Sequence, residues 1–193
     1  MGLVALAATL VFVAASAAGS GLGNGDFERG DFTNWNTLSS SINSGWFIYS
    51  GKQTPPAGAR IDPPPQGTYA ASAGQLAPSE VVLYRTLPLG TTKTQQVSFY
   101  EYYRNHCNEF VPGFQEYRAD ILRDGADPFS TDPGDILKKL FRTKPGDPQS
   151  MEPTLRKYVL SGLSGPVTLR FLVIANCAPL SGAVDDVRMQ SAS

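Results

Sequence analysis

The chain has 193 residues, of which 16 are Lys or Arg and 17 are Asp or Glu, so its formal net charge is −1 at pH 7. A chain without a strong positive field is a poor partner for nucleic acids or anionic membranes, so both classes are set aside. The length is about that of one domain and is sufficient to bury a full hydrophobic core.

The first 18 residues have the character of an export signal. Residues 2–18 are apolar or small and uncharged, and Ala-Ser-Ala at 15–17 matches the pattern that a signal peptidase accepts. No Lys or Arg precedes this stretch, which leaves a start further upstream or a membrane anchor as alternatives. A span needs about 20 strongly apolar residues, however, and this one is diluted with Ala, Gly, Ser and Thr. We therefore expect a signal peptide over 1–18, one domain over 19–193, and a secreted chain that does not insert into membranes.

The remainder of the chain has an all-β pattern. The 19 Gly and 15 Pro divide it into short segments in which apolar and polar residues alternate, as they do in strands with one buried face. This many strands in one domain predict two packed antiparallel sheets. In chain order, the predicted strands cover residues 25–29, 46–50, 68–72, 81–86, 95–103, 117–123, 156–161, 167–175 and 183–189.

Two Pro-rich polar stretches, residues 51–66 and 125–153, are predicted to be loops. Within the second, Asp132 as N-cap and Pro133 at the first helical position predict one short helix over 132–141. Its apolar residues would then seal one end of the fold: Leu137, Leu140 and Phe141.

Both ends of the chain carry distinctive motifs. Residues 24–28 read N-G-D-F-E, residues 32–35 read F-T-N-W, and residues 185–187 read D-D-V. Together they resemble the two ends of galactose-binding-like jelly-roll modules, which include many carbohydrate-binding modules of secreted bacterial proteins. The resemblance implies a two-sheet jelly-roll β-sandwich, and it covers the ends of the chain better than the middle.

The same resemblance implies a structural calcium ion. In such modules, the Glu of the first motif and the first Asp of the last often hold calcium with backbone carbonyls, and these positions are Glu28 and Asp185 here. Calcium takes six to eight hard oxygen ligands. Alternatively, the two carboxylates accept backbone N–H bonds or pair with neighbouring arginines. Asn24 and Asp26 are weaker candidates, because they would also suit the turn before the first strand.

The two cysteines, Cys107 and Cys177, are an even number in a chain expected to enter an oxidising compartment. Each follows a predicted strand, so a disulfide would join two loops at the ends of adjacent strands. Closing a loop of this length is worth roughly 4 kcal/mol in the chain-entropy model. Two buried free thiols are the alternative.

The alternation of polar and apolar residues along the predicted strands also predicts a ligand-binding surface. Side chains on one face of a strand recur every second residue, which places five polar or aromatic residues opposite the apolar faces of three strands. Aromatic platforms beside Arg and carboxylate groups suit sugars. Cross-strand ion pairs on a solvated face, with tyrosines covering the sheet, are the alternative. The predicted ligand-binding residues are Tyr100, Tyr102, Arg118, Asp120 and Arg170.

Catalysis has little support in the sequence. His106 is the single histidine and adjoins Cys107, and neighbouring side chains tend to point apart, so a Cys–His dyad is not expected. A glycosidase needs two carboxylates across a cleft. Glu101 and Asp120 are a candidate pair, but alternation places Glu101 on the apolar side of its strand.

The sequence therefore predicts a secreted, non-catalytic module that binds a glycan or cell-surface polysaccharide. The alternatives are a structural or adhesive surface protein that binds another protein, and a glycoside hydrolase. We expect Trp35 and Trp46 in the core, whereas for Tyr49 and Tyr69 the sequence leaves open whether they line a rim.

Overall fold

The computed structural model describes residues 22–52, 60–75, 78–90 and 94–192. The predicted signal peptide and part of the first Pro-rich loop lie outside these residues. Within them, no helix has the length and apolarity needed to cross a membrane. The strands are β1 (Asn36–Ser39), β2 (Ser44–Tyr49), β3 (Ala70–Gln75), β4 (Ser79–Leu89), β5 (Gln95–Asn105), β6 (Gln115–Arg123), β7 (Ile136–Arg142), β8 (Ser150–Leu160), β9 (Gly165–Ala175) and β10 (Leu180–Ser191).

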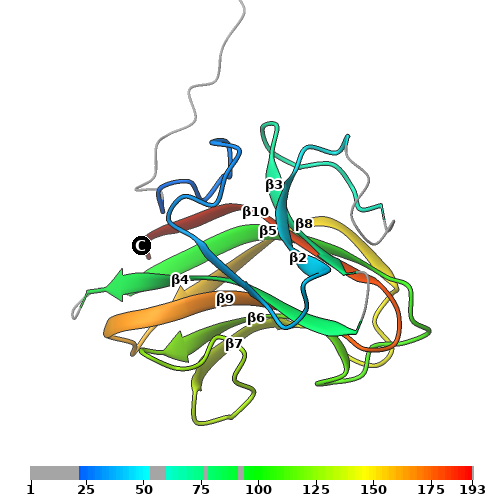
Figure 1. Ribbon diagram of the computed structural model, residues 1–193. Helices are drawn as coiled ribbons and strands as arrows, with labels where there is room; N and C mark the ends of the chain where they lie inside the picture. Colours follow the sequence, from blue (N-terminus) through cyan, green and yellow to red (C-terminus); the bar gives the residue numbers. More distant parts are fainter. Residues whose placement is uncertain (1–21, 53–59, 76–77, 91–93, 193) are drawn as a thin grey trace, which may run out of the picture.

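The strands form two five-stranded antiparallel sheets, in the orders β1-β4-β9-β6-β7 and β2-β3-β10-β5-β8. Figure 1 shows the first sheet below the second, with β4, β9, β6 and β7 following one another down the view. The predicted all-β fold with two packed antiparallel sheets is thus confirmed. Because each sheet has one face against the other, its opposite face is available for a site.

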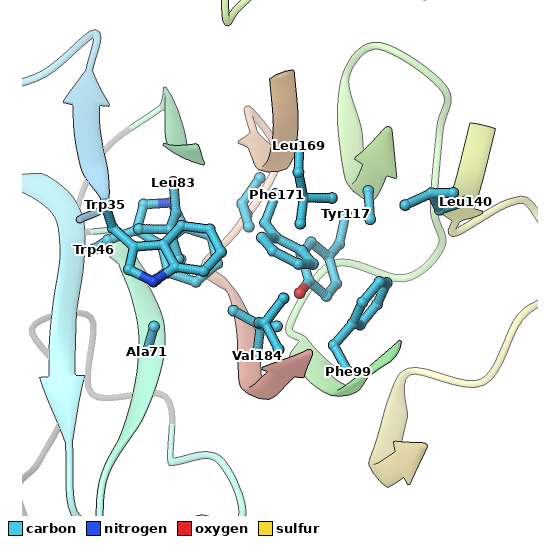
Figure 2. Packing of buried hydrophobic residues seen from close by; sticks show 14 of the residues in the cluster. Trp35, Trp46, Ala71, Leu83, Phe99, Tyr117, Leu140, Leu169, Phe171 and Val184 are labelled. Atoms are coloured by element: carbon cyan, nitrogen blue, oxygen red, sulfur yellow. The ribbon is translucent and has the colours of Figure 1, made fainter. Parts of the chain in front are cut away.

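One continuous core fills the space between the sheets. In β9, alternate residues from Val167 to Val173 are 1% exposed or less and face this core. Phe171 meets Phe99 of β5 edge to face, with ring centroids 5.0 Å apart. Trp35 and Trp46 are 6% and 7% exposed and belong to the same cluster, as predicted (Figure 2).

The predicted strand at 25–29 is wrong, because this segment is a series of turns. Asn24 and Phe27 have φ angles of 60° and 55°, which an extended strand does not allow. The Asn24 side chain holds the turns together by donating to the carbonyl of Asp31 at 2.9 Å. At the same place Val187 N donates to Gly25 O at 2.7 Å, so the start and end of the fold lie side by side.

The predicted helix at 132–141 is also wrong. Asp132 does accept a hydrogen bond, at 2.8 Å, from the backbone N–H of Gly134, but the result is a turn rather than a helix start. The chain then continues as β7, which pairs with β6 at the edge of the sheet. Backbone hydrogen bonds to β6 outweigh the local helical preference. Leu140 and Phe141 still pack into the core, whereas Leu137 is 44% exposed.

The predicted disulfide is confirmed. Cys107 and Cys177 are bonded, with their Cα atoms 5.8 Å apart. Cys107 follows β5 and Cys177 follows β9, and these strands belong to different sheets. The expectation of adjacent strands was therefore wrong: the bond ties the two sheets together at one end of the sandwich.

Candidate ligand-binding site

A polar groove of about 320 Å³ lies on the outer face of the second sheet. It runs across β10, β5 and β8, which lie next to one another in that order. Amide, hydroxyl and charged side chains line most of it. From β5 and β8 come Gln96, Ser98, Tyr100, Leu155 and Lys157, and Gln66, Asp186, Arg188 and Gln190 complete the walls.

Strand register explains the shape of this groove. Ser98 of β5 pairs with Arg188 of β10 on one side and with Lys157 of β8 on the other. A short hydroxyl side chain therefore lies between two long ones, and the surface is hollow above it. In the next row, Gln190 Nε2 donates to Gln96 Oε1 at 3.1 Å.

Only one of the two predicted tyrosines lies in the groove. Tyr100 lines it and is half-buried, whereas Tyr102 is fully buried in a small cluster with Tyr49, Ile61 and Ala183. Burial raises the pKa of the Tyr102 phenol well above its ordinary value. The hydroxyl of Tyr49 donates to Ile61 O at 2.9 Å. The open question about Tyr49 is thus answered: its ring is buried beside Tyr102 and Ile61 and does not line a rim.

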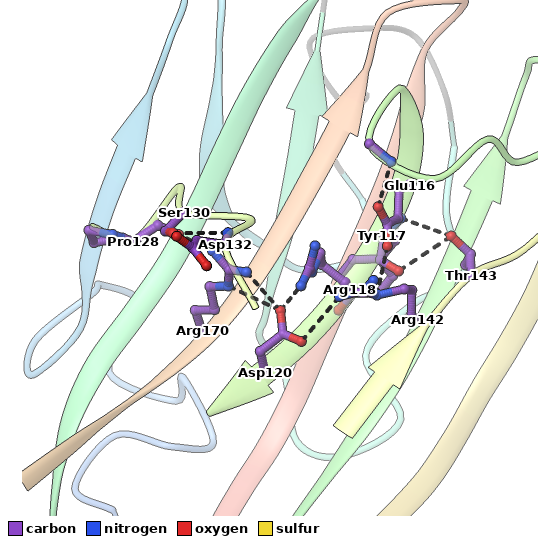
Figure 3. A network of polar contacts seen from close by, with 11 residues as sticks. Glu116, Tyr117, Arg118, Asp120, Pro128, Ser130, Asp132, Arg142, Thr143 and Arg170 are labelled. Atoms are coloured by element: carbon purple, nitrogen blue, oxygen red, sulfur yellow. Dashed lines mark hydrogen bonds and ion pairs between the residues drawn. The ribbon is translucent and has the colours of Figure 1, made fainter. Parts of the chain in front are cut away.

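The other three predicted ligand residues lie on the opposite side of the molecule. Arg118 and Asp120 are on β6 and Arg170 is on β9, and both strands belong to the first sheet. The single face expected for all five residues is therefore wrong. Alternation placed each side chain correctly outside the core, but it could not tell which sheet a strand joins. Figure 3 shows the three side chains meeting around the Asp120 carboxylate.

This cluster is a buried ion-pair network. Arg118 Nε and Arg170 Nη2 lie 2.6 and 2.9 Å from Asp120 Oδ2, and all three side chains are at most 2% exposed. Residues 124–135, which join β6 to β7, cover it: Arg170 Nη1 donates to Pro128 O at 2.6 Å. Phe129 packs beside the cluster against buried residues of β4 and β9. The structure thus has the ion pairs of the alternative interpretation, but they are buried instead of solvated.

Glu28 and Asp185 flank the segment around Gly67. Glu28 Oε1 accepts hydrogen bonds from the N–H groups of Thr68 and Tyr69, both at 2.8 Å, and Asp185 Oδ2 accepts one from Gln66 N at 3.3 Å. Asp185 is fully buried. Burial raises the pKa of Asp185 to about 8, backbone N–H donors oppose the increase, and the charges of Asp186 and Glu28 add to it.

A small pocket of about 150 Å³ opens at this place, lined by Asp26, Glu28, Gln66, Gly67, Asp186 and Arg188. Three of these residues also line the groove, so the pocket lies at one end of it. Gly67 has a φ of 57°, and a side chain there would run into the Glu28 carboxylate. No group of three or more Asp, Glu, His or Cys side chains suited to a metal occurs in the described part of the chain. A cation here would therefore need backbone carbonyls and water besides Glu28 and Asp185.

The two carboxylates considered for catalysis belong to different sheets and do not face each other across a cleft. Glu101 is fully buried on the core side of β5, as alternation predicted, and Arg156 Nε lies 2.7 Å from its Oε1. Burial raises the pKa of Glu101 to about 8, although Arg156 opposes this. Asp120 lies on the outer face of the other sheet, and Cys107 is held in the disulfide.

The sequence interpretation missed Lys157 and Arg188. The sequence did contain a signal that Lys157 faces outward: Leu155, Lys157 and Val159 alternate with Arg156 and Tyr158, as the two faces of a strand do. The predicted strand began at 156, whereas β8 begins at Ser150 and is twice as long. Arg188 lay in a predicted strand, but a register irregularity between Asp185 and Arg188 shifts the alternation there.

The sequence matches no protein-family profile and no curated protein sequence. The fold, in contrast, is similar to several solved structures. The K1 cleaved adhesin domain of Lys-gingipain from Porphyromonas gingivalis W83 matches with a TM-score of 0.56 at 13% identity, over 87% of this chain and 96% of that one. TmCBM61, solved in complex with β-1,4-galactotriose, matches with a TM-score of 0.50 at 14% identity, over 88% and 96%.

The enzymatically active domain of tailspike protein 4 from bacteriophage CBA120 is similar as well, with a TM-score of 0.54 at 11% identity. The match covers 88% of this chain but only 21% of that chain, so this chain corresponds to a small part of the tailspike structure. At such identities the similarity shows the fold: a β-sandwich shared with carbohydrate-binding modules and adhesin domains.

Proposed function

We propose that this chain is an exported, non-catalytic module that binds carbohydrate in the groove across β10, β5 and β8. The groove itself is the observation that carries the proposal. Its three glutamine side chains can each donate and accept hydrogen bonds, as sugar hydroxyls require. Tyr100 and Leu155 add an apolar surface for the C–H face of a sugar ring.

Two further observations support this assignment. The fold is similar to that of TmCBM61, whose structure contains a galactotriose. The disulfide between Cys107 and Cys177 fits an oxidising compartment, in agreement with the signal peptide predicted over residues 1–18.

A structural calcium ion between Glu28 and Asp185 is part of the proposal. Asp185 is a fully buried carboxylate with no cationic side chain within ion-pair distance among the described residues. Burying such a charge is costly unless a proton or a cation neutralises it, and calcium would supply the cation. The two carboxylates, with carbonyls of the adjoining backbone and water, provide the hard oxygens that calcium prefers. The ion would fasten the 66–69 segment to the middle of β10.

The test is calorimetry of the intact chain against a panel of neutral and acidic oligosaccharides. Tyr100→Ala should weaken binding by more than about 1 kcal/mol, because it removes the aromatic surface of the groove. Tyr84→Ala is a matched control, since Tyr84 is also half-buried but packs on the outer face of the other sheet. Absence of binding to every saccharide would overturn the proposal.

An adhesive protein that binds another protein is the second candidate. Ile42, between β1 and β2, is 99% exposed, and Leu38 of β1 is 42% exposed. Apolar side chains in such positions are typical of protein contacts when they form a patch. If Ile42→Ser abolishes adhesion to a protein-coated surface while the saccharide panel stays negative, this candidate replaces the first.

A further inference from the structure

Three neighbouring strands place two cations on either side of one small residue. Arg188, Ser98 and Lys157 form a row across β10, β5 and β8. Neighbouring strands lie about 4.8 Å apart, so the two cationic residues start about 10 Å from each other. Their long side chains rise beside the short hydroxyl of Ser98. The floor of the groove is therefore a hollow with a cation on each side.

Of these two cations, Lys157 has a side chain that is unpaired among the described residues, and Arg188 is paired with Asp186 but stays partly exposed. The Lys157 side chain is exposed and forms no hydrogen bond or ion pair in the part of the chain that the structure describes. Arg188 donates its Nε to Asp186 Oδ1 at 2.7 Å, and its side chain remains 45% exposed. Among the lining residues, Asp186 is the one carboxylate and Lys157 and Arg188 are the cations, so the lining has one excess positive charge, and Asp26 and Glu28 lie in the pocket at the Arg188 end.

Lys157 differs in this respect from the arginines that lie near carboxylates. Arg156 is paired with the buried Glu101, Arg170 with the buried Asp120 and Arg188 with the more exposed Asp186, so in each case the protein itself supplies the anion. In the groove no carboxylate faces Lys157. An anion over Ser98 could receive charge-assisted hydrogen bonds from both sides and one from the serine hydroxyl.

The rest of the lining points to what carries that anion. Gln96 and Gln190 lie in the next row and Tyr100 and Leu155 in the row on the other side of Ser98. Amides suit hydroxyl groups, and the aromatic and aliphatic surface suits a ring face. We propose that the groove selects acidic saccharides, with a carboxylate or sulfate group of the sugar seated over Ser98 between Lys157 and Arg188. This inference rests on the proposed carbohydrate-binding function and names the class of ligand.

The experiment is calorimetry of the intact chain with three matched oligomers: galacturonate, sulfated galactose and neutral galactose. The chain should prefer one or both acidic oligomers, and the comparison of the first two identifies the acid. Lys157→Gln should lower the affinity for the preferred acidic oligomer about tenfold, the effect of losing a hydrogen bond to a charged group. It should leave the affinity for the neutral oligomer unchanged, and Lys157→Arg should retain acidic binding.

A matched control separates a built site from general attraction between charges. Lys139 is an exposed lysine on β7, in the opposite sheet, so Lys139→Gln makes the same change in net charge. Its binding should equal that of the wild type. An equal loss in both glutamine variants overturns the inference, because the attraction would then be nonspecific.

The remaining outcomes distinguish the inference from the function on which it rests. Equal affinity for neutral and acidic oligomers, unchanged by Lys157→Gln, overturns acidic selectivity and keeps the carbohydrate-binding function. If the chain binds none of the three oligomers and no other saccharide of the panel, both the acidic selectivity and the carbohydrate-binding function are overturned.

Discussion

The two outer faces of the sandwich carry similar charged residues and use them in opposite ways. On the β6–β9 face, Arg118, Asp120 and Arg170 are buried and paired with one another beneath residues 124–135. On the β10–β5–β8 face, Lys157 and Arg188 border an open groove. Charges under a loop must satisfy each other, because water is excluded, whereas charges in an open groove can exchange water for a ligand. Whether a loop covers the sheet thus decides which role the residues take.

The largest effect is expected from removing the centre of the covered cluster. Asp120→Ala leaves the fully buried Arg170 and the nearly buried Arg118 without their shared carboxylate. Breaking a buried ion pair from one side typically costs about 3–5 kcal/mol, so the free energy of unfolding should fall by that amount. Urea denaturation measures it, with Lys157→Gln on the open face as the control that should remain stable. Equal stabilities of the two variants would contradict the comparison.

The difference between the faces shows what the sequence could and could not predict. Alternation correctly placed Tyr100, Tyr102, Arg118 and Arg170 outside the core. It could not reveal that β5 and β6 belong to different sheets, because strand order depends on pairing between distant segments. Nor could it reveal the covering loops, since the burial of Tyr102 depends on contacts with Ile61, which is remote in sequence.

Predictions that did not depend on which strands pair were reliable. The disulfide followed from the cysteine count and the expected compartment, and the core position of Trp35 from its motif. The helix prediction at 132–141 failed because the turn at Asp132 and Pro133 has the same sequence signature as a helix start. Only the pairing of β7 with β6 distinguishes the two outcomes, and that pairing is not local.

The second prediction concerns the acidic pocket at the end of the open groove. If Glu28 and Asp185 hold calcium, an ion at one hundred times its dissociation constant stabilises the native state by about 2.7 kcal/mol. For a domain of this size, that raises the melting temperature by roughly 5–10 °C. Thermal unfolding with calcium and with chelator measures the shift.

Two variants sharpen this calcium test. Asp185→Asn should abolish the calcium response by removing a ligand, and Gly67→Ala should weaken it by displacing the Glu28 carboxylate. A wild-type chain whose melting temperature is the same in millimolar calcium and in chelator would rule the ion out. Loss of calcium should also lower the affinity for acidic saccharides more than for neutral ones, because Asp186 and Glu28 then repel the ligand at the end of the groove.

The third prediction concerns a carboxylate that is buried between the two sheets instead of under a loop on an outer face. This residue is Glu101. The pKa of this carboxyl is raised to about 8 in the folded protein, against an ordinary value of 4.5. Between these two values the native state binds more protons than the unfolded state. The contribution of Glu101 to stability is therefore greatest at low pH and is lost as the pH rises toward 8, at no more than about 1.4 kcal/mol per pH unit.

Denaturation of the wild type and of Glu101→Gln at pH 5, 6, 7 and 8 measures this contribution. Gln does not titrate, and its amide oxygen can still accept the hydrogen bond from Arg156. The difference between the two unfolding free energies should shift steadily with pH. Asp185 titrates in both proteins, so its effect cancels in the difference. Parallel pH curves would show that Arg156 keeps Glu101 charged in the fold.

The smallest effect is expected on the open face, and it completes the contrast with Asp120. Gln96 and Gln190 share one exposed hydrogen bond at 3.1 Å in the groove. Surface substitutions away from buried networks usually change stability by less than about 0.5 kcal/mol, so Gln96→Ala should unfold like the wild type. The same variant should lose saccharide affinity, because a donor and acceptor leave the groove. If Gln96→Ala instead lost about as much stability as Asp120→Ala and showed no binding defect, the open face would be structural too. The proposal that the groove binds a ligand would then be wrong.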